Sequence, residues 1–221
     1  MGRVFRDNGL TIVLMSLFAA SVVGMALAGL TAYNEERAQE GFVALRMGQY
    51  LVSGQFMSAL YENWESEFLQ MGAYVVLTAY LFQRGSPESK DSDAGSEEQD
   101  RDPARDRGKA DAPWPVRVGG VATKVYAHSL GAALFLLFAI SFCLHWVNSA
   151  RAQAEEAIMR GETGPQLVDY LGDPQLWFES FQNWQSEFLS TAVLIVLAIF
   201  LREKGSPESK AVGDPHGKTG A

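Results

Sequence analysis

Apolar and polar positions alternate along this chain in long blocks. Residues 10–33 and 125–150 contain no charged side chain. Both runs exceed the roughly 20 residues that a helix needs to cross a hydrocarbon core about 30 Å thick. Two shorter runs, 68–83 and 188–201, reach that length once the Trp-containing residues before them are included. The pattern predicts an all-α, polytopic membrane protein with four transmembrane helices, at about residues 10–32, 64–84, 125–149 and 184–203.

The second half of the chain repeats the first at a shift of 120 positions without a gap. The pattern NWxSEFL occurs at residues 63–69 and 183–189, and GSPESK occurs at 85–90 and 205–210. Such agreement at separate places indicates duplication, which fixes the unit of architecture. We therefore predict two tandem two-helix repeats, residues 1–90 and 118–210. Because each repeat crosses the membrane twice, both are expected to insert in the same, parallel orientation.

Polar composition marks the connections and the orientation. Residues 91–117 and 211–221 are poor in large apolar side chains, so we predict a disordered linker and a disordered tail. Lys and Arg gather at the helix ends on the side of this linker, which the positive-inside rule makes cytoplasmic. The sequence therefore predicts a multi-pass protein of the bacterial inner membrane with both termini in the cytoplasm. The N-terminal segment looks like a signal peptide, but its counterpart lies in mid-chain, so we expect it to be retained.

Each repeat contains an outer amphipathic segment just before its second span. Aromatic side chains there match the belt found at the level of lipid headgroups. The predicted interface anchors are Tyr61, Trp64, Trp177 and Trp184. At the other end, Gly85 and Gly205 each follow a cation and precede a proline by two residues, which is typical of a helix stop.

A polar stripe follows one face of each second helix. Its members lie at i, i+4 and i+7 and enter the outer part of the apolar span, so they are expected to face the bundle interior. The candidate site residues are Asn63, Glu67, Gln70, Asn183, Glu187 and Ser190. In one interpretation the repeats bring Glu67 and Glu187 together as a proton or cation site. In the other, each glutamate only hydrogen-bonds to neighbouring helices.

Chemistry beyond this stripe is sparse. The net charge of −8 argues against a nucleic-acid partner. His128 and His145 lie about 25 Å apart on one predicted helix, too far to share a metal. His145 with Glu155 or Glu156 is a weak candidate for an outer metal site. No nucleophile elbow, phosphate loop or HExxH motif is present, so we expect no enzyme activity and no cofactor.

A family resemblance rests on two stretches of the first repeat, with counterparts in the second. They are Tyr50-Leu51-x-Ser53-Gly54-x-Phe56 and Glu62-Asn63-Trp64-x-Ser66-Glu67-Phe68-Leu69-Gln70. This pattern resembles a bacterial membrane-protein family known as a domain of unknown function (family 6766). The resemblance implies a four-helix membrane protein and does not indicate an activity.

Two functions remain open from the sequence. The first is a non-enzymatic scaffold or accessory membrane subunit, whose expected partners are the lipid bilayer and other membrane proteins or a second copy. The second is a small proton or cation transporter or channel that uses Glu67 and Glu187. The scarcity of ionisable residues at mid-membrane depth argues against the second.

Overall fold

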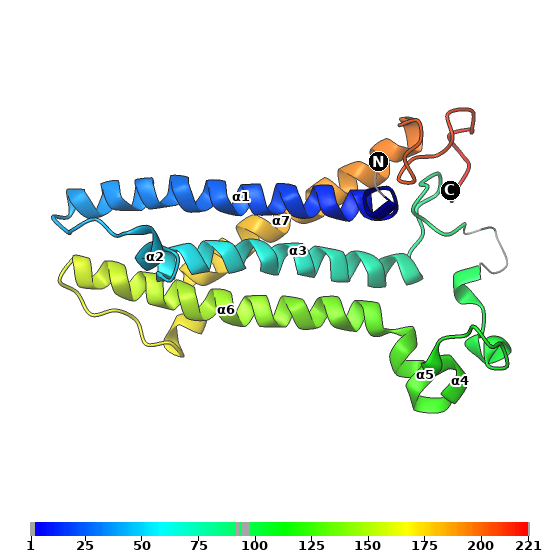
Figure 1. The fold of residues 1–221 in the computed structure, drawn as a ribbon, viewed down its shortest axis with the longest axis horizontal. Coiled ribbons are helices and arrows are strands. Elements are labelled where there is room, and N and C mark those ends of the chain that lie inside the picture. The colour runs from blue at the N-terminus through cyan, green and yellow to red at the C-terminus, as the bar shows by residue number, and fades with distance from the viewer. Residues whose placement is uncertain (1–2, 92, 94–97, 221) are drawn as a thin grey trace. The chain divides into compact units, whose positions relative to one another are not determined.

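The computed structural model describes residues 3–91, 93 and 98–220, and every regular element in this part of the chain is helical. The all-α prediction is therefore confirmed. The long helices are α1 (Arg3–Gln39), α3 (Gly54–Tyr80), α6 (Ser129–Met159) and α7 (Pro174–Phe200) (Figure 1). The short ones are α2 (Met47–Tyr50), α4 (Trp114–Val118), α5 (Gly120–Ala127) and the single turns η1 (Glu98–Asp100), η2 (Pro103–Asp106) and η3 (Asp169–Gly172).

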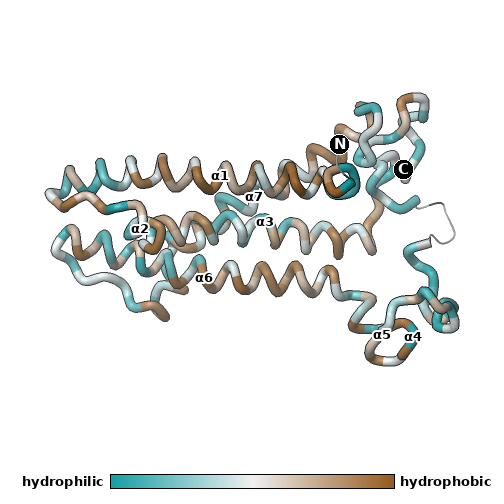
Figure 2. The backbone as a smooth tube through the Cα atoms, in the orientation of Figure 1, coloured by the Kyte–Doolittle hydropathy of each residue, from teal (hydrophilic) through white to brown (hydrophobic). Residues whose placement is uncertain are grey.

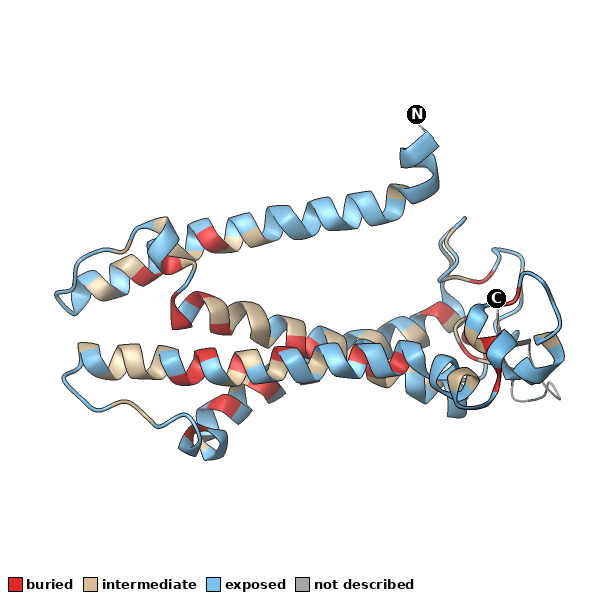
Figure 3. Cartoon of the chain, turned by 60° about the horizontal axis from the view of Figure 1, so that its bottom comes forward, coloured by how far each residue is buried: buried red, intermediate tan, exposed pale blue. Residues whose placement is uncertain are grey.

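Three of these helices are candidate membrane spans. Among the described residues, α1, α6 and α7 are long and apolar enough to cross a membrane. Apolar positions run along the middle of α1 and α6 (Figure 2), and α1 is exposed over most of its length (Figure 3). Exposed apolar helices suit a lipid surround rather than water. The fourth predicted span, α3, does not meet the same test, because its first half carries three glutamates and a glutamine.

The chain divides into two compact units. The first contains the residues up to Tyr61 together with Cys143–Leu176, and the second contains Glu62–Phe142 and the residues from Trp177 onward.

In the first unit, α1 and α2 share an aromatic core. Tyr33, Tyr50 and Phe56 are buried and in ring contact, with centroids 5.4 to 5.9 Å apart. Gly29 of α1 makes room for Tyr50, since a Cβ at Gly29 would lie 2.2 Å from the tyrosine hydroxyl. The connection between α1 and α2 is fixed by Asn34, whose side chain both donates to and accepts from the backbone of Leu45.

The start of α3 lies against α6 in the same unit. A Cβ at Gly54 would come within 2.4 Å of the Ala152 backbone nitrogen, so only glycine permits this approach. The Gly54 amide donates to the Glu155 carboxylate at 3.3 Å, which suits the positive end of the α3 dipole. Nearby, the Ser149 and Tyr170 hydroxyls are hydrogen-bonded at 2.9 Å and buried.

In the second unit, α3 and α6 meet through glycines. Gly72 of α3 lies against Leu134, and Gly131 of α6 lies against Val76. Aromatic rings connect α6 with α7 in a continuous row of contacts. The row consists of Phe138, Phe142, Trp177, Phe181 and Trp184.

Several boundaries recur at the spacing of 120 residues. The 27-residue helices α3 and α7 begin and end at equivalent positions, and α1 and α6 end at equivalent positions, Gln39 and Met159. The backbone also breaks at equivalent places. Asn8 interrupts α1 with φ −133°, and His128 ends α5 with φ −115°.

The second helices of the two repeats end earlier than the sequence predicted. We expected the second helices to continue to about residues 84 and 203, but they end at Tyr80 and Phe200. The reason lies in the following turns, where Ser89 and Ser209 accept the amides of Gln83 and Glu203 that would otherwise continue the helix.

The predicted linker, residues 91–117, contains η1, η2 and the start of α4. Ion pairs of Asp106 with Arg101 and Lys109 brace η2 locally. Hydrogen bonding from Lys109 and the two positive charges lower the pKa of Asp106. Sequence composition missed these short turns because local side-chain pairs, not apolar burial, accompany them. Residues 92 and 94–97 of this linker lie outside the described residues.

Candidate polar site along α3 and α7

Polar side chains of α3 pair with α7 in the second unit. Three hydrogen bonds join the helices: Asn183 Nδ2 to Glu62 Oε1, Trp184 Nε1 to Glu65 Oε1 at 2.8 Å, and Gln70 Nε2 to Thr191 Oγ1 at 2.6 Å. Glu65 is fully buried. Together these pairs cover more than two turns of each helix, so three polar side chains of α3 are directed at α7.

The predicted stripe is partly assembled by these contacts. Gln70 and Asn183 take part in them. The carboxyl groups of Glu67 and Glu187 lie close enough to interact electrostatically. Asn63 and Ser190 instead lie at exposed positions, and the Ser190 hydroxyl donates within its own helix to the Glu187 carbonyl at 2.9 Å.

The sequence analysis missed Glu62, Glu65 and Thr191. Polar residues at 62, 63, 65 and 67 surround the helix on several sides, so periodicity alone does not choose the face that meets α7. The predicted anchors have mixed surroundings. Trp184 bonds to Glu65, Trp177 contacts Phe142 and Phe181, and Tyr61 and Trp64 are half-buried.

The two GSPESK segments form the same turn after α3 and after α7. Each begins with a glycine at positive φ, 86° for Gly85 and 89° for Gly205. In each, the first serine hydroxyl accepts the glutamate amide, and the second donates to the lysine carbonyl. Because α3 and α7 end at Tyr80 and Phe200, five residues before these glycines, the GSPESK segments form turns after the helices and are not the helix stops that the sequence predicted.

Glu88 and Glu208, the glutamates of the two turns, form a pair. Tyr74 of α3 donates a hydrogen bond to Glu88 Oε2. Burial and the nearby carboxyl of Glu208 raise the pKa of Glu88 to about 7. Glu88 Oε1 is buried and has no N–H or O–H donor among the described residues. A protonated Glu88 avoids a second negative charge beside Glu208.

Glu88 lies between two cavities of the second unit. One, of 310 Å³, extends from Gln70 and Thr191 past Tyr74 to Glu88 and is otherwise mostly apolar. The other, of 660 Å³, is bordered by Glu88, Lys90, Asp100, Thr219 and Gly220. A mostly apolar cavity thus leads from the inner turn at Glu88 to Gln70 in the middle of α3. Sequence reasoning overlooked Glu88 and Glu208; their recurrence inside GSPESK was the available signal.

The weak metal candidates are not brought together. Ten residues separate His145 from Glu155 on one helix, a rise of about 15 Å. The Glu155 carboxylate pairs with Arg151 at 2.9 Å, and Glu156 pairs with Arg160 at 3.4 Å. His145 is fully buried. Both glutamates therefore form ion pairs with arginines of their own helix.

The fold and these contacts define an all-helical protein with apolar helices fit for a membrane and polar groups directed between α3 and α7. Residues 1–221 match a family model described as "Domain of unknown function (DUF6766)", and the chain belongs to that family. Neither curated proteins nor solved structures gave a match.

Proposed function

We propose that this is a four-span membrane protein that moves protons or small cations along α3 and α7. The observation that carries the proposal is the row of polar contacts between these helices. It runs from Glu62 through Gln70 into the cavity that ends at Glu88. Helices that only anchor a protein in lipid do not need such a row, and polar groups inside membrane bundles often mark ion or proton pathways.

The pairing of α3 with α7 supports a fourth crossing. An unpaired polar group in hydrocarbon costs several kcal/mol. This cost is large enough to keep a helix that carries such groups out of the membrane. In α3, Glu62, Glu65 and Gln70 have hydrogen-bond partners on α7, whereas Glu67 is exposed. The penalty is therefore reduced, and α3 is suited to cross beside α7 even though its composition alone is too polar.

The duplication proposed from the sequence has support in the matching helix ends and in the two identical turns. Two equivalent hairpins in one chain place their connecting turns on one side of the membrane. With the clustered Lys and Arg, this supports the proposed bacterial inner-membrane location with both termini in the cytoplasm.

The charges along the route favour cations. Glu67 and Glu187 lie toward its outer end, and Glu88 is the ionisable group of the inner cavity. Gln70 and Thr191 stand between them, and their hydrogen bond lies about 15 Å from the inner end of α3 at 1.5 Å per residue. We therefore assign Glu67 and Glu187 to an outer proton or cation site, Glu88 to an inner one, and the Gln70–Thr191 pair to the constriction.

The test is proton and cation flux into liposomes that contain the purified protein. We expect flux that falls to the level of empty liposomes in the Glu67→Gln, Glu187→Gln double variant. Ser190→Ala is the matched control, because Ser190 is exposed on the same helix and bonds only within it. Equal flux in the double variant and the wild type would remove the glutamates from the mechanism.

A second candidate is a non-enzymatic scaffold or accessory subunit that binds lipid and other membrane proteins or a second copy. One observation favours it: hydrogen bonds such as Trp184 to buried Glu65 hold α3 and α7 together whether or not anything moves between them. Absence of flux under several ion gradients, with the protein folded, would make this the better description.

A further inference from the structure

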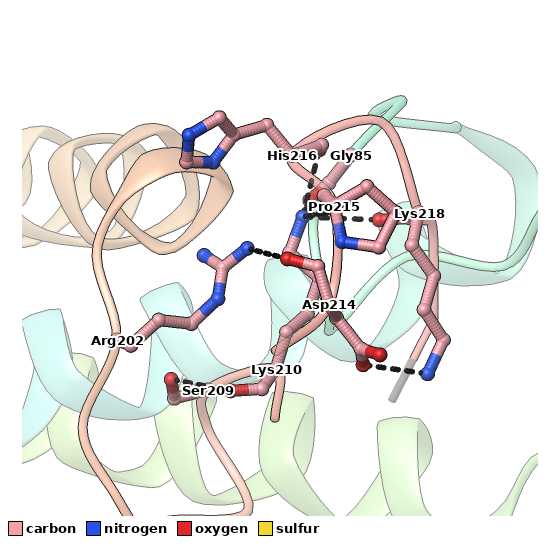
Figure 4. Close-up of polar contacts among 8 residues, drawn as sticks. All are labelled: Gly85, Arg202, Ser209, Lys210, Asp214, Pro215, His216 and Lys218. Carbon is pink, nitrogen blue, oxygen red and sulfur yellow. Dashed lines mark hydrogen bonds and ion pairs between the residues drawn. The ribbon is translucent and has the colours of Figure 1, made fainter. Parts of the chain in front are cut away.

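The segment after Lys210 is tied down by that lysine. The Lys210 side chain is 2% exposed, and its ammonium group donates to backbone carbonyls only (Figure 4). Gly85 O and His216 O lie at 2.7 Å, Lys218 O at 3.1 Å and Pro215 O at 3.4 Å. One acceptor belongs to the first GSPESK turn, and three belong to residues 215–218. The Lys210 side chain therefore joins the first GSPESK turn to residues 215–218.

Only the charged lysine fits this cage. An ammonium has three N–H donors, which four carbonyls can share, whereas a neutral amine has two. Burial and the charge of Arg202 lower the pKa of Lys210, while the charge of Asp214 raises it. The four carbonyls accept the N–H groups of the charged form. Burying this cation without hydrogen-bond acceptors would be costly. The carbonyls of residues 215–218 therefore stabilise the buried charge only while these residues keep their folded position.

Further bonds extend the same attachment. Arg202 donates to the Asp214 carbonyl at 3.0 Å, and the Gly85 amide donates to Thr219 Oγ1 at 2.9 Å. The Gly220 amide then donates to the Ser86 carbonyl at 3.0 Å. Gly85 is needed here, because a Cβ would lie 2.8 Å from the His216 carbonyl oxygen. Residues 211–220 thus lie along the first turn as a strap.

We propose that residues 211–220 are an inhibitory strap, locked by Lys210, which closes the inner end of the route beside Glu88. Thr219 and Gly220 border the same 660 Å³ cavity as Glu88, so the strap forms one of its walls. Release of the strap would remove this wall and widen the opening of the cavity. The closing role rests on the proposed cation route, whereas the lock is a property of the fold by itself.

The lock is tested by hydrogen exchange of the full-length protein in detergent. In Lys210→Met we expect the Gly85 and Gly220 amides to lose their protection while α3 and α7 keep theirs. Lys90→Met is the matched control, since Lys90 occupies the same place in the first GSPESK segment but pairs with Asp100. Unchanged protection of Gly220 in Lys210→Met would overturn the lock.

The closing role is tested by flux in liposomes for Lys210→Met and for a chain that ends at Lys210. Both should carry more flux than the wild type, and both increases should vanish when Glu67 and Glu187 are also replaced by glutamine. The truncated chain protects the test against misfolding caused by the Lys210 substitution. If the wild type carries flux, and the strap is released in a variant whose flux does not rise, the closing role is wrong and the cation route stands. Absence of flux from every variant would refute the cation route and the closing role together, and exchange would still decide the lock.

Discussion

Gly54 shows how one residue controls a helix contact. It begins α3 where that helix meets the backbone of α6, and its counterpart at the 120-residue spacing is Pro174. We expect Gly54→Ala to destabilise the protein by about 1–3 kcal/mol, because the added methyl meets backbone that cannot rotate away. Thermal unfolding in detergent measures this. Gly24→Ala in α1, where a Cβ would meet nothing within 4 Å, should be neutral or stabilising. Equal losses in both variants would show that the Gly54 contact is not tight.

Individual residues also show what the sequence can and cannot predict. Gln70 and Asn183 were expected to face other helices, because a polar residue within an apolar run has few other places to go, and both form hydrogen bonds between α3 and α7. Asn63 was expected beside them, but Glu62 and Glu65 occupy that face. A hydrophobic pattern fixes which residues avoid lipid on average. The rotation of a helix about its axis is decided by the helices that pack against it. One sequence alone does not show which helices these are.

At the scale of elements, the paired turns make a pH-dependent prediction. The pKa of Glu88 is raised from 4.5 to about 7, so the folded protein holds its proton more tightly than the unfolded chain does. That contribution to stability is fully present below about pH 4.5 and is lost as the pH rises through about 7. Tyr74 and Glu208 are the titratable groups that contact it.

We expect the unfolding temperature of the wild type to fall across this window and that of Glu88→Gln to fall less. Glu203→Gln is the control, because Glu203 lies in the chain before the second turn and is exposed. A wild-type profile as flat as that of Glu88→Gln would mean that the pKa of Glu88 is not raised in the folded protein. The pairing itself could not be predicted, since it joins turns 120 residues apart through side chains that look like ordinary helix-stop glutamates.

At the scale of the whole molecule, the number of crossings has one decisive consequence. Apolar run length alone predicts four spans, yet α3 is ambiguous because its composition does not show that polar side chains such as Gln70 are paired. If α3 crosses, the linker lies on the side opposite the connection between α1 and α2, and the two outer connections share a side. If α3 does not cross, the linker shares a side with the first connection, and the second connection is on the opposite side.

Cysteine labelling separates these topologies. Cys143 is first replaced by alanine, because it is a free, exposed thiol. Single cysteines are then introduced by Val43→Cys, Ala110→Cys and Glu162→Cys, all at exposed positions outside the long helices. With four crossings, a membrane-impermeant maleimide added to intact cells should label the variants at 43 and 162, and the one at 110 only after permeabilisation. With three crossings, labelling from outside should reach 43 and 110 but not 162. The second pattern would remove α3 from the membrane, and with it the route along α3 and α7.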